Sequence, residues 1–193
     1  VGEKHKVVDF LVDCGSARVL IDAKGVDLAI LGKVTFDPDV LARRTKNSVL
    51  KGVEQGLEVA DRLPDRRPTY LLLVTYKELY LGNGQRFFSA VGKEEYQSLA
   101  QKHDASTWIP PEHIYIVSVQ SFEFLVECIR NGLNLADTLR NAVSRDMQGM
   151  TMGKFVFSQH LEEEVKCFKG EVPKFMQDEF QRLGVALKSA FEA

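Results

Sequence analysis

Two apolar segments near the start of the chain show the alternation of a β-hairpin. Residues 6–14 (KVVDFLVDC) and 17–24 (ARVLIDAK) are rich in β-branched and apolar side chains, and only Gly15 and Ser16 separate them. A glycine at the first position of a two-residue loop favours a type II′ turn, which sets a register in which the numbers of paired residues sum to 31. The first two strands are therefore predicted to be antiparallel neighbours.

That register gathers charged side chains on one face of the hairpin. Asp9 is predicted to lie opposite Asp22, and Lys24 shares the face of Asp22 because side chains alternate between faces with a period of two. Leucines accompany the acids on this face, and the other face carries the apolar residues Phe10, Val12, Val19 and Ile21. Because both faces are partly apolar, we expect helices to cover both.

Further along the chain, helical and strand patterns follow one another. Helices are predicted over residues 47–63, 93–103, 122–131, 135–146 and 171–191, and strands over residues 69–76, 77–88 and 114–119. Asn47 or Ser48 is expected to cap the first of these helices, and Ser121 the third. Gly52 and Gly56 fall inside the first helix, where they are costly unless the helix backbone packs closely on a sheet. The order of the elements predicts an α/β domain.

Composition narrows the class of protein. The 193 residues are 45% hydrophobic and 27% charged, which is typical of one ordinary soluble domain and excludes disorder or a fibrous repeat over the whole chain. Lys and Arg number 25 against 27 Asp and Glu, so the formal net charge of −2 provides no global basic field. A nucleic-acid partner would have to bind a local patch.

Cysteine usage and hydropathy bear on the compartment. Cys14, Cys128 and Cys167 have no CxxC spacing, so the sequence predicts neither a disulfide framework nor a structural zinc site. The apolar runs are far shorter than the roughly 20 residues of a membrane helix, and no signal peptide opens the chain. We therefore expect a cytoplasmic protein that binds no membrane.

Two carboxylates and a lysine on one hairpin face suit a divalent cation beside a phosphate. Hard oxygen ligands bind Mg²⁺, the ion polarises a phosphoryl oxygen and lowers the pKa of a bound water, and a lysine orients that water or offsets developing charge. The alternative is that Asp9, Asp22 and Lys24 form ordinary ion pairs at a strand end. Asp13, nearer the turn, is expected to pair with Arg18 and not to serve as a ligand.

The charged residues of the hairpin and of the following helix occur in an informative order. Val8-Asp9 comes first, Asp22-Ala23-Lys24 follows in the hairpin, and Lys51-Gly-Val-Glu-Gln55 lies on the next helix. Over residues 6–76 this order resembles the PD-(D/E)XK nuclease superfamily, which has the restriction-endonuclease-like fold. The resemblance implies a mixed central sheet flanked by helices.

The resemblance also implies roles for individual residues. The catalytic residues would be Asp9, Asp22, Lys24 and Gln55, and the ligands of Mg²⁺ or Mn²⁺ would be Asp9, Asp22 and Ala23. Lys24 would activate the attacking water, and Gln55 would steady the site together with Lys51, which shares its helix face. In this family a helix and a strand, often with a further acidic ligand, precede the first acid, whereas only eight residues precede Asp9. Either upstream residues are missing from this chain, or Glu3 and its neighbours replace them.

A basic run precedes and enters the same helix. Residues 43–51 contain Arg43, Arg44, Lys46 and Lys51 and no acid. A helix N-terminus with adjacent basic side chains favours phosphate, because its N–H groups and macrodipole both attract anions. A solvated charged loop is the alternative, but the proximity of the predicted metal site favours contacts with a DNA backbone.

Together these features predict a Mg²⁺-dependent endonuclease that hydrolyses DNA, with RNA left open as a substrate. Residues 1–150 would form the nuclease-like domain and residues 151–193 a helical C-terminal extension of it. By analogy with the family we expect a role in prokaryotic antiviral defence, as a homodimer or in an assembly with other subunits. Two alternatives stay open: a non-catalytic nuclease-like module that binds nucleic acid or a partner protein, and an α/β domain unrelated to nucleases.

Overall fold

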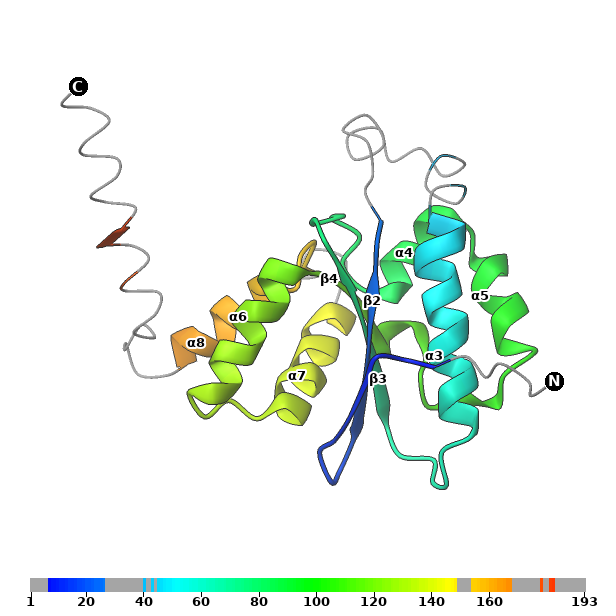
Figure 1. Cartoon of the computed structure of the whole chain (residues 1–193), viewed down its shortest axis with the longest axis horizontal. Coiled ribbons are helices and arrows are strands. Elements are labelled where there is room, and N and C mark those ends of the chain that lie inside the picture. Colours follow the sequence, from blue (N-terminus) through cyan, green and yellow to red (C-terminus); the bar gives the residue numbers. More distant parts are fainter. Residues whose placement is uncertain are drawn as a thin grey trace.

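The computed structural model describes residues 7–26, 45–148 and 154–167, and the single positions 40, 43, 178, 181 and 182. These residues form an α/β fold around a four-stranded mixed sheet (Figure 1). In their order across the sheet, the strands are β1 (Phe10–Asp13), β2 (Arg18–Lys24), β3 (Thr69–Thr75) and β4 (Ile114–Ser118). β1 is antiparallel to β2, whereas β2, β3 and β4 are parallel to one another.

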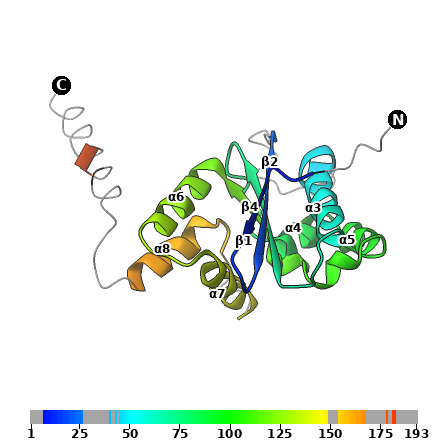
Figure 2. The same cartoon turned by 60° about the horizontal axis from the view of Figure 1, so that its bottom comes forward.

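Helices lie on both faces of this sheet (Figures 1 and 2), so the prediction of two covered faces holds for β2 but not for β1, whose apolar residues are exposed. On one face lie α3 (Lys51–Asp61), α4 (Gly84–Val91) and α5 (Lys93–Ala100). On the other lie α6 (Val119–Arg130), α7 (Leu135–Met147) and α8 (Ser158–Cys167). Shorter helical turns are Lys46–Leu50, Asp104–Thr107 and Pro111–His113. Leu20 belongs to the first apolar core, and Val19 and Ile21 belong to the second, so β2 is buried from both sides.

The hairpin has the predicted register. Phe10 pairs with Ile21 and Asp13 with Arg18, so the paired residue numbers sum to 31. Gly15 has a φ of +76°, a left-handed value that glycine adopts readily, and the N–H of Ser16 donates a hydrogen bond to the Cys14 carbonyl at 2.9 Å. β1 is an edge strand whose four residues are all exposed, and its hydrogen-bonded partner among the described strands is β2.

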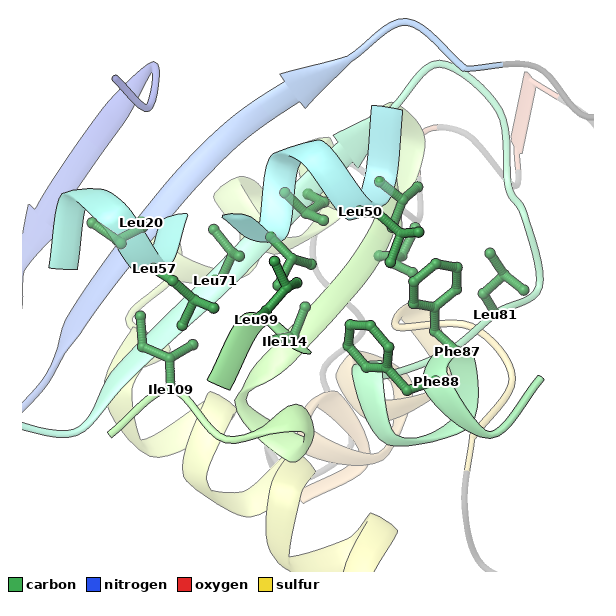
Figure 3. Packing of buried hydrophobic residues seen from close by; sticks show 14 of the residues in the cluster. Leu20, Leu50, Leu57, Leu71, Leu81, Phe87, Phe88, Leu99, Ile109 and Ile114 are labelled. Carbon is green, nitrogen blue, oxygen red and sulfur yellow. The ribbon is translucent and has the colours of Figure 1, made fainter. Parts of the chain in front are cut away.

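Helix α3 packs closely on the sheet through its two glycines. A Cβ atom on Gly56 would lie 2.7 Å from Leu71 Cδ2, and one on Gly52 would lie 2.9 Å from Leu73 Cδ2. Both glycines are therefore explained by close packing, which confirms the sequence-based expectation. Figure 3 shows Leu57 of the same helix in the core cluster that includes Leu71 of β3.

The strand predicted at residues 77–88 is wrong, because half of this segment is helical. Asn83 caps α4, with its Oδ1 accepting a hydrogen bond from the N–H of Arg86 at 3.1 Å. The helix then buries Phe87 and Phe88 in the first core. The Gly-Asn-Gly sequence is thus the start of a helix and not the turn of a hairpin.

Two helix starts also differ from the prediction. The turn Lys46–Leu50 is π-helical and runs directly into α3, so neither Asn47 nor Ser48 caps that helix. At α6 the cap is Ser118, whose Oγ accepts a hydrogen bond from the N–H of Ser121 at 3.2 Å. The helices predicted at 93–103 and 135–146 and the strand predicted at 114–119 are confirmed as α5, α7 and β4.

The C-terminal part is described only in α8 and at a few later positions. Phe157 and Leu161 are buried in the second core, so α8 packs on the same side of the sheet as α6 and α7. The helix predicted at residues 171–191 lies outside the described residues, apart from helical positions at 178, 181 and 182. In the part of the chain that the structure describes, no helix combines the length and the apolar character needed to cross a membrane.

Candidate active site

Two aspartates meet where β2 ends and β1 begins. Asp22 is the fifth residue of β2 and is only 4% exposed, whereas Asp9 precedes β1 and is exposed. The N–H of Ala23 donates a hydrogen bond to Asp9 Oδ2 at 2.7 Å, which holds this carboxylate against β2. The antiparallel register of the hairpin thus carries both acids to the same edge of the sheet.

Lys24 joins the acids to helix α3. Its Nζ lies 2.5 Å from Asp22 Oδ2 and donates a hydrogen bond to Gln55 Oε1 at 2.6 Å. The lysine side chain runs directly over Gly52, because a Cβ atom at that position would lie 2.7 Å from Lys24 Cε. Gly52 therefore leaves room for the lysine side chain, and Gln55, three residues further along α3, accepts its hydrogen bond.

Within the described part of the chain, the charges of this group do not balance. Two carboxylates face one ammonium group, and burial raises the pKa of Asp22 above that of an ordinary aspartate. Lys24 opposes that rise in the pKa, whereas the nearby charge of Asp9 adds to it. The buried Oδ2 of Asp22 contacts Lys24 as an ion pair but is not aligned to accept a hydrogen bond. A cation placed between the two acids would supply the missing positive charge.

The donor set fits a hard divalent cation. The Asp9 and Asp22 carboxylates and the main-chain carbonyl of Ala23 are oxygen ligands of the type that Mg²⁺ prefers. Among the described residues no three His, Cys, Asp or Glu side chains gather in a metal-binding cluster. Two carboxylates are nevertheless enough for Mg²⁺, which is usually bound by one or two carboxylates and keeps several waters.

The predicted phosphate-binding run is described only in part. Arg43 is exposed, and Lys51 is exposed at the first position of α3. Arg44 and the side chain of Lys46 lie outside the described residues, as does Glu3. The structure therefore leaves the contact between this run and a DNA backbone as a prediction.

Asp13 lies at the other end of the hairpin, in a separate cluster of charges. Asp13 pairs with Arg18 in the strand register and forms an exposed ion pair, as expected, but its ionic partner is Arg67, whose Nη2 contacts Asp13 Oδ2 at 2.8 Å, and not Arg18. Arg18 contacts Asp65 Oδ1 at 2.5 Å instead. The arginine from the loop before β3 reaches Asp13 because β3 runs beside β2, a neighbour that the local hairpin pattern does not reveal.

Sequence reasoning missed the contact between Gly52 and Lys24. The pattern predicts that Gly52 packs on a sheet, but not that a lysine from that sheet crosses it. The signal in the sequence is a glycine three residues before Gln55, and this spacing becomes informative only when α3 is known to lie over β2.

Comparison with known proteins identifies no relative of this chain. No family model matches the chain, and neither a curated protein nor a solved structure shows a significant match. The described residues form an α/β fold with a mixed four-stranded sheet. The candidate site is therefore judged from the geometry of its residues alone.

Proposed function

We propose that this protein is a Mg²⁺- or Mn²⁺-dependent nuclease of the restriction-endonuclease-like class that hydrolyses DNA phosphodiester bonds. The observation that supports it is the meeting of Asp9, Asp22, Lys24 and Gln55 at one edge of the sheet. These four residues come from the start of β1, the end of β2 and helix α3, in the order that the family resemblance implies. The mixed sheet, with an antiparallel hairpin joined to parallel strands, is compatible with that fold.

The chain supplies the groups that such a reaction needs. When bound, a divalent cation polarises the phosphoryl oxygen and lowers the pKa of the attacking water. Asp9 and Asp22 would hold the cation, and the hydrogen bond from Ala23 fixes the orientation of Asp9. Lys24, held by Gln55, would keep its ammonium group beside the scissile phosphate and offset the negative charge that develops there.

The first experiment is cleavage of supercoiled plasmid and of linear DNA by the purified protein with Mg²⁺ or Mn²⁺, with an EDTA control. Cleavage should depend on the metal and should be lost in Asp22→Asn. A folded wild-type protein that cuts neither DNA nor RNA under these conditions would overturn the proposal. Cleavage that survives Asp22→Asn would show that the activity belongs to another site or to a contaminant.

A second candidate is a nuclease-like module that binds nucleic acid without cutting it. The favouring observation is that Lys24 already neutralises Asp22 at 2.5 Å, so the site is held together without a metal ion. Such a module would bind DNA equally well with Mg²⁺ and with EDTA and would show no cleavage. Calorimetric titration with Mg²⁺ separates the two candidates, because only the nuclease requires a bound ion.

A further inference from the structure

The Lys24 ammonium group lies where a cation bound to Asp22 would lie. Its Nζ is 2.5 Å from Asp22 Oδ2, and the side chains of Lys24 and Asp22 are only 15% and 5% exposed. A Mg²⁺ ion bound to the same oxygen would be about 2.0–2.1 Å from it. Two positive charges this close repel each other strongly in a partly buried site, where water and salt screen little. The ammonium group and a divalent cation therefore cannot both contact Asp22 Oδ2.

The contact between Lys24 and Asp22 is an ion pair without hydrogen-bond alignment. Asp22 Oδ2 is buried and, among the residues that the structure describes, has no aligned hydrogen-bond donor. Exchange of the ammonium group for another cation at this oxygen therefore gives up an electrostatic attraction but no aligned hydrogen bond. Asp9 adds a second carboxylate, held against β2 by the N–H of Ala23 at 2.7 Å. Because a divalent ion attracts each carboxylate more strongly than an ammonium group does, the two acids favour the exchange.

Gln55 gives the ammonium group a second partner. Gln55 Oε1 accepts a hydrogen bond from Lys24 Nζ at 2.6 Å, and it belongs to helix α3 and not to the hairpin that carries the acids. Gly52 of the same helix leaves room for the lysine side chain, since a Cβ atom there would lie 2.7 Å from Lys24 Cε. The ammonium group is thus held from two elements, so loss of its contact with Asp22 leaves it a hydrogen-bond partner.

We propose that the Lys24 ammonium group and the divalent cation compete for Asp22, and that Gln55 is the positioning residue that keeps the displaced ammonium group at the site. This inference rests on the proposed nuclease function and adds a regulation of that site. Lys24 leaves its acid only when a cation takes its place, so the lysine becomes available to a substrate phosphate only in the metal-loaded protein. Without a cation, the same lysine offsets the repulsion between the two acids.

The test is calorimetric titration of the protein with Mg²⁺ in the absence of DNA, at about pH 8, where aspartates are ionised. Lys24→Met keeps most of the side-chain volume and should bind Mg²⁺ about 10- to 100-fold more tightly than wild type, because the competing ammonium group is gone. Gln55→Leu should bind Mg²⁺ about tenfold more weakly, because the displaced ammonium group loses its remaining partner. The matched control is the double variant Lys24→Met/Gln55→Leu, which should have the affinity of Lys24→Met.

A crystal structure of the wild-type protein with Mg²⁺ tests the displacement directly and does not depend on the folding of a variant. The distance from Lys24 Nζ to Asp22 Oδ2 should exceed about 4 Å, the limit of an ion pair, with the hydrogen bond to Gln55 kept. Mg²⁺ bound while Lys24 still contacts Asp22 Oδ2 would overturn the inference. Equal Mg²⁺ affinities of wild type and Gln55→Leu would overturn it too, because a lysine that stays on Asp22 uses Gln55 equally with and without the ion.

The outcomes separate this inference from the nuclease proposal. Metal-dependent plasmid cleavage by the wild type, together with a Mg²⁺ affinity that neither Lys24→Met nor Gln55→Leu changes, would overturn the competition and leave the nuclease intact. The expected order of affinities without cleavage by the wild type would support the competition and reject the nuclease. Absence of Mg²⁺ binding in both the folded wild type and folded Lys24→Met would overturn the inference.

Discussion

The two ends of the first hairpin carry similar charged residues, but acidic and basic side chains are equal in number at the turn end and unequal at the other end among the described residues. At the turn end, Asp13 and Asp65 face Arg18 and Arg67, with contacts of 2.5 Å for Arg18–Asp65 and 2.8 Å for Arg67–Asp13. At the other end, Lys24 is the cation that contacts Asp9 or Asp22 among the residues that the structure describes. The two acids and two arginines at the turn end balance, whereas at the other end two acids stand against one lysine when only the described residues are counted.

The pKa directions follow this difference. The hydrogen bond from Arg67, and then that from the Gly15 N–H, lower the pKa of Asp13, so its charged form is favoured in the folded protein. Burial raises the pKa of Asp22, so its charged form is opposed there. Burial outweighs the opposing effect of Lys24 at Asp22, and perturbed pKa values of this kind are more frequent at functional sites than elsewhere.

The largest contrast is expected in DNA cleavage. Lys24→Met and Asp22→Asn should each lower the metal-dependent cleavage rate by about 10²–10⁴-fold, the usual range for loss of a group that assists proton transfer or charge stabilisation. Asp13→Asn makes the same chemical change at the balanced end and should leave the rate within about twofold of wild type. Initial rates of plasmid nicking measure all three, and equal losses in Asp13→Asn and Asp22→Asn would remove the distinction between the two ends.

Metal affinity at the Asp9–Asp22 end of the hairpin should depend on pH. A proton on Asp22 competes with the cation, so the affinity should be flat above the pKa of this group and fall about tenfold per pH unit below it. Because that pKa is raised, the decline should begin at a higher pH than for an ordinary aspartate. Calorimetric titration with Ca²⁺ or Mn²⁺ across the acidic range checks this, with Asp22→Asn as the control, in which the part of the decline that comes from Asp22 should disappear. A decline that begins below the ordinary aspartate pKa would contradict the assignment.

The close contact between Lys24 and helix α3 can be tested with two equivalent glycine-to-alanine substitutions in that helix. Gly52→Ala places a methyl group 2.7 Å from Lys24 Cε and 2.9 Å from Leu73 Cδ2, whereas the nearest atoms to the methyl group of Gly56→Ala belong to Leu71, at 2.7 Å. Either change gains about 1 kcal/mol of helix propensity against an overpacking cost of about 1–3 kcal/mol. Gly52→Ala should lower cleavage by about tenfold because the lysine, the flexible partner in the contact, has to move.

Gly56→Ala is the matched control, and it should cleave at the wild-type rate once the folded fraction is taken into account. Urea unfolding supplies that fraction. A shift of the pH–rate profile in Gly52→Ala alone would identify displacement of Lys24, since a purely structural defect does not change the pH profile.

The smallest effect on function is expected from the balanced end. Arg18 is buried and loses its contacts with Asp65 in Arg18→Met, including the hydrogen bond to the Asp65 carbonyl. Because Asp65 is half-exposed and regains water, the loss should be about 1–2 kcal/mol of unfolding free energy. Urea denaturation measures it, and cleavage at saturating metal should stay at the wild-type rate. A large loss of cleavage without loss of stability would show that this end also serves the reaction.

The hairpin and the meeting of Asp9 with Asp22 could be predicted from the sequence because both depend on local residues. A two-residue loop fixes the register, and the register alone brings Asp9 to Asp22. The contact between Lys24 and Gln55 is not local, and it was reached only through the order of residues that resembles a nuclease family.

The errors arise where tertiary context outweighs local pattern. Around Asn83 the sequence suits a hairpin turn and a helix cap equally well, and burial of Phe87 against the sheet decides for the helix. The partner of Asp13 depends on Arg67, which reaches it only because β3 lies beside β2. No pattern within the hairpin contains that information.

The position of β1 at the edge of the sheet links cation binding to local unfolding. β1 is four residues long and exposed, and Asp9 directly precedes it. Short edge strands with few buried contacts open with low free energy, so the amides of β1 should exchange with solvent faster than those of β3. A cation held by both Asp9 and Asp22 would bind only the closed strand and would slow that exchange. The metal ion would then stabilise the pairing of β1 with the rest of the sheet.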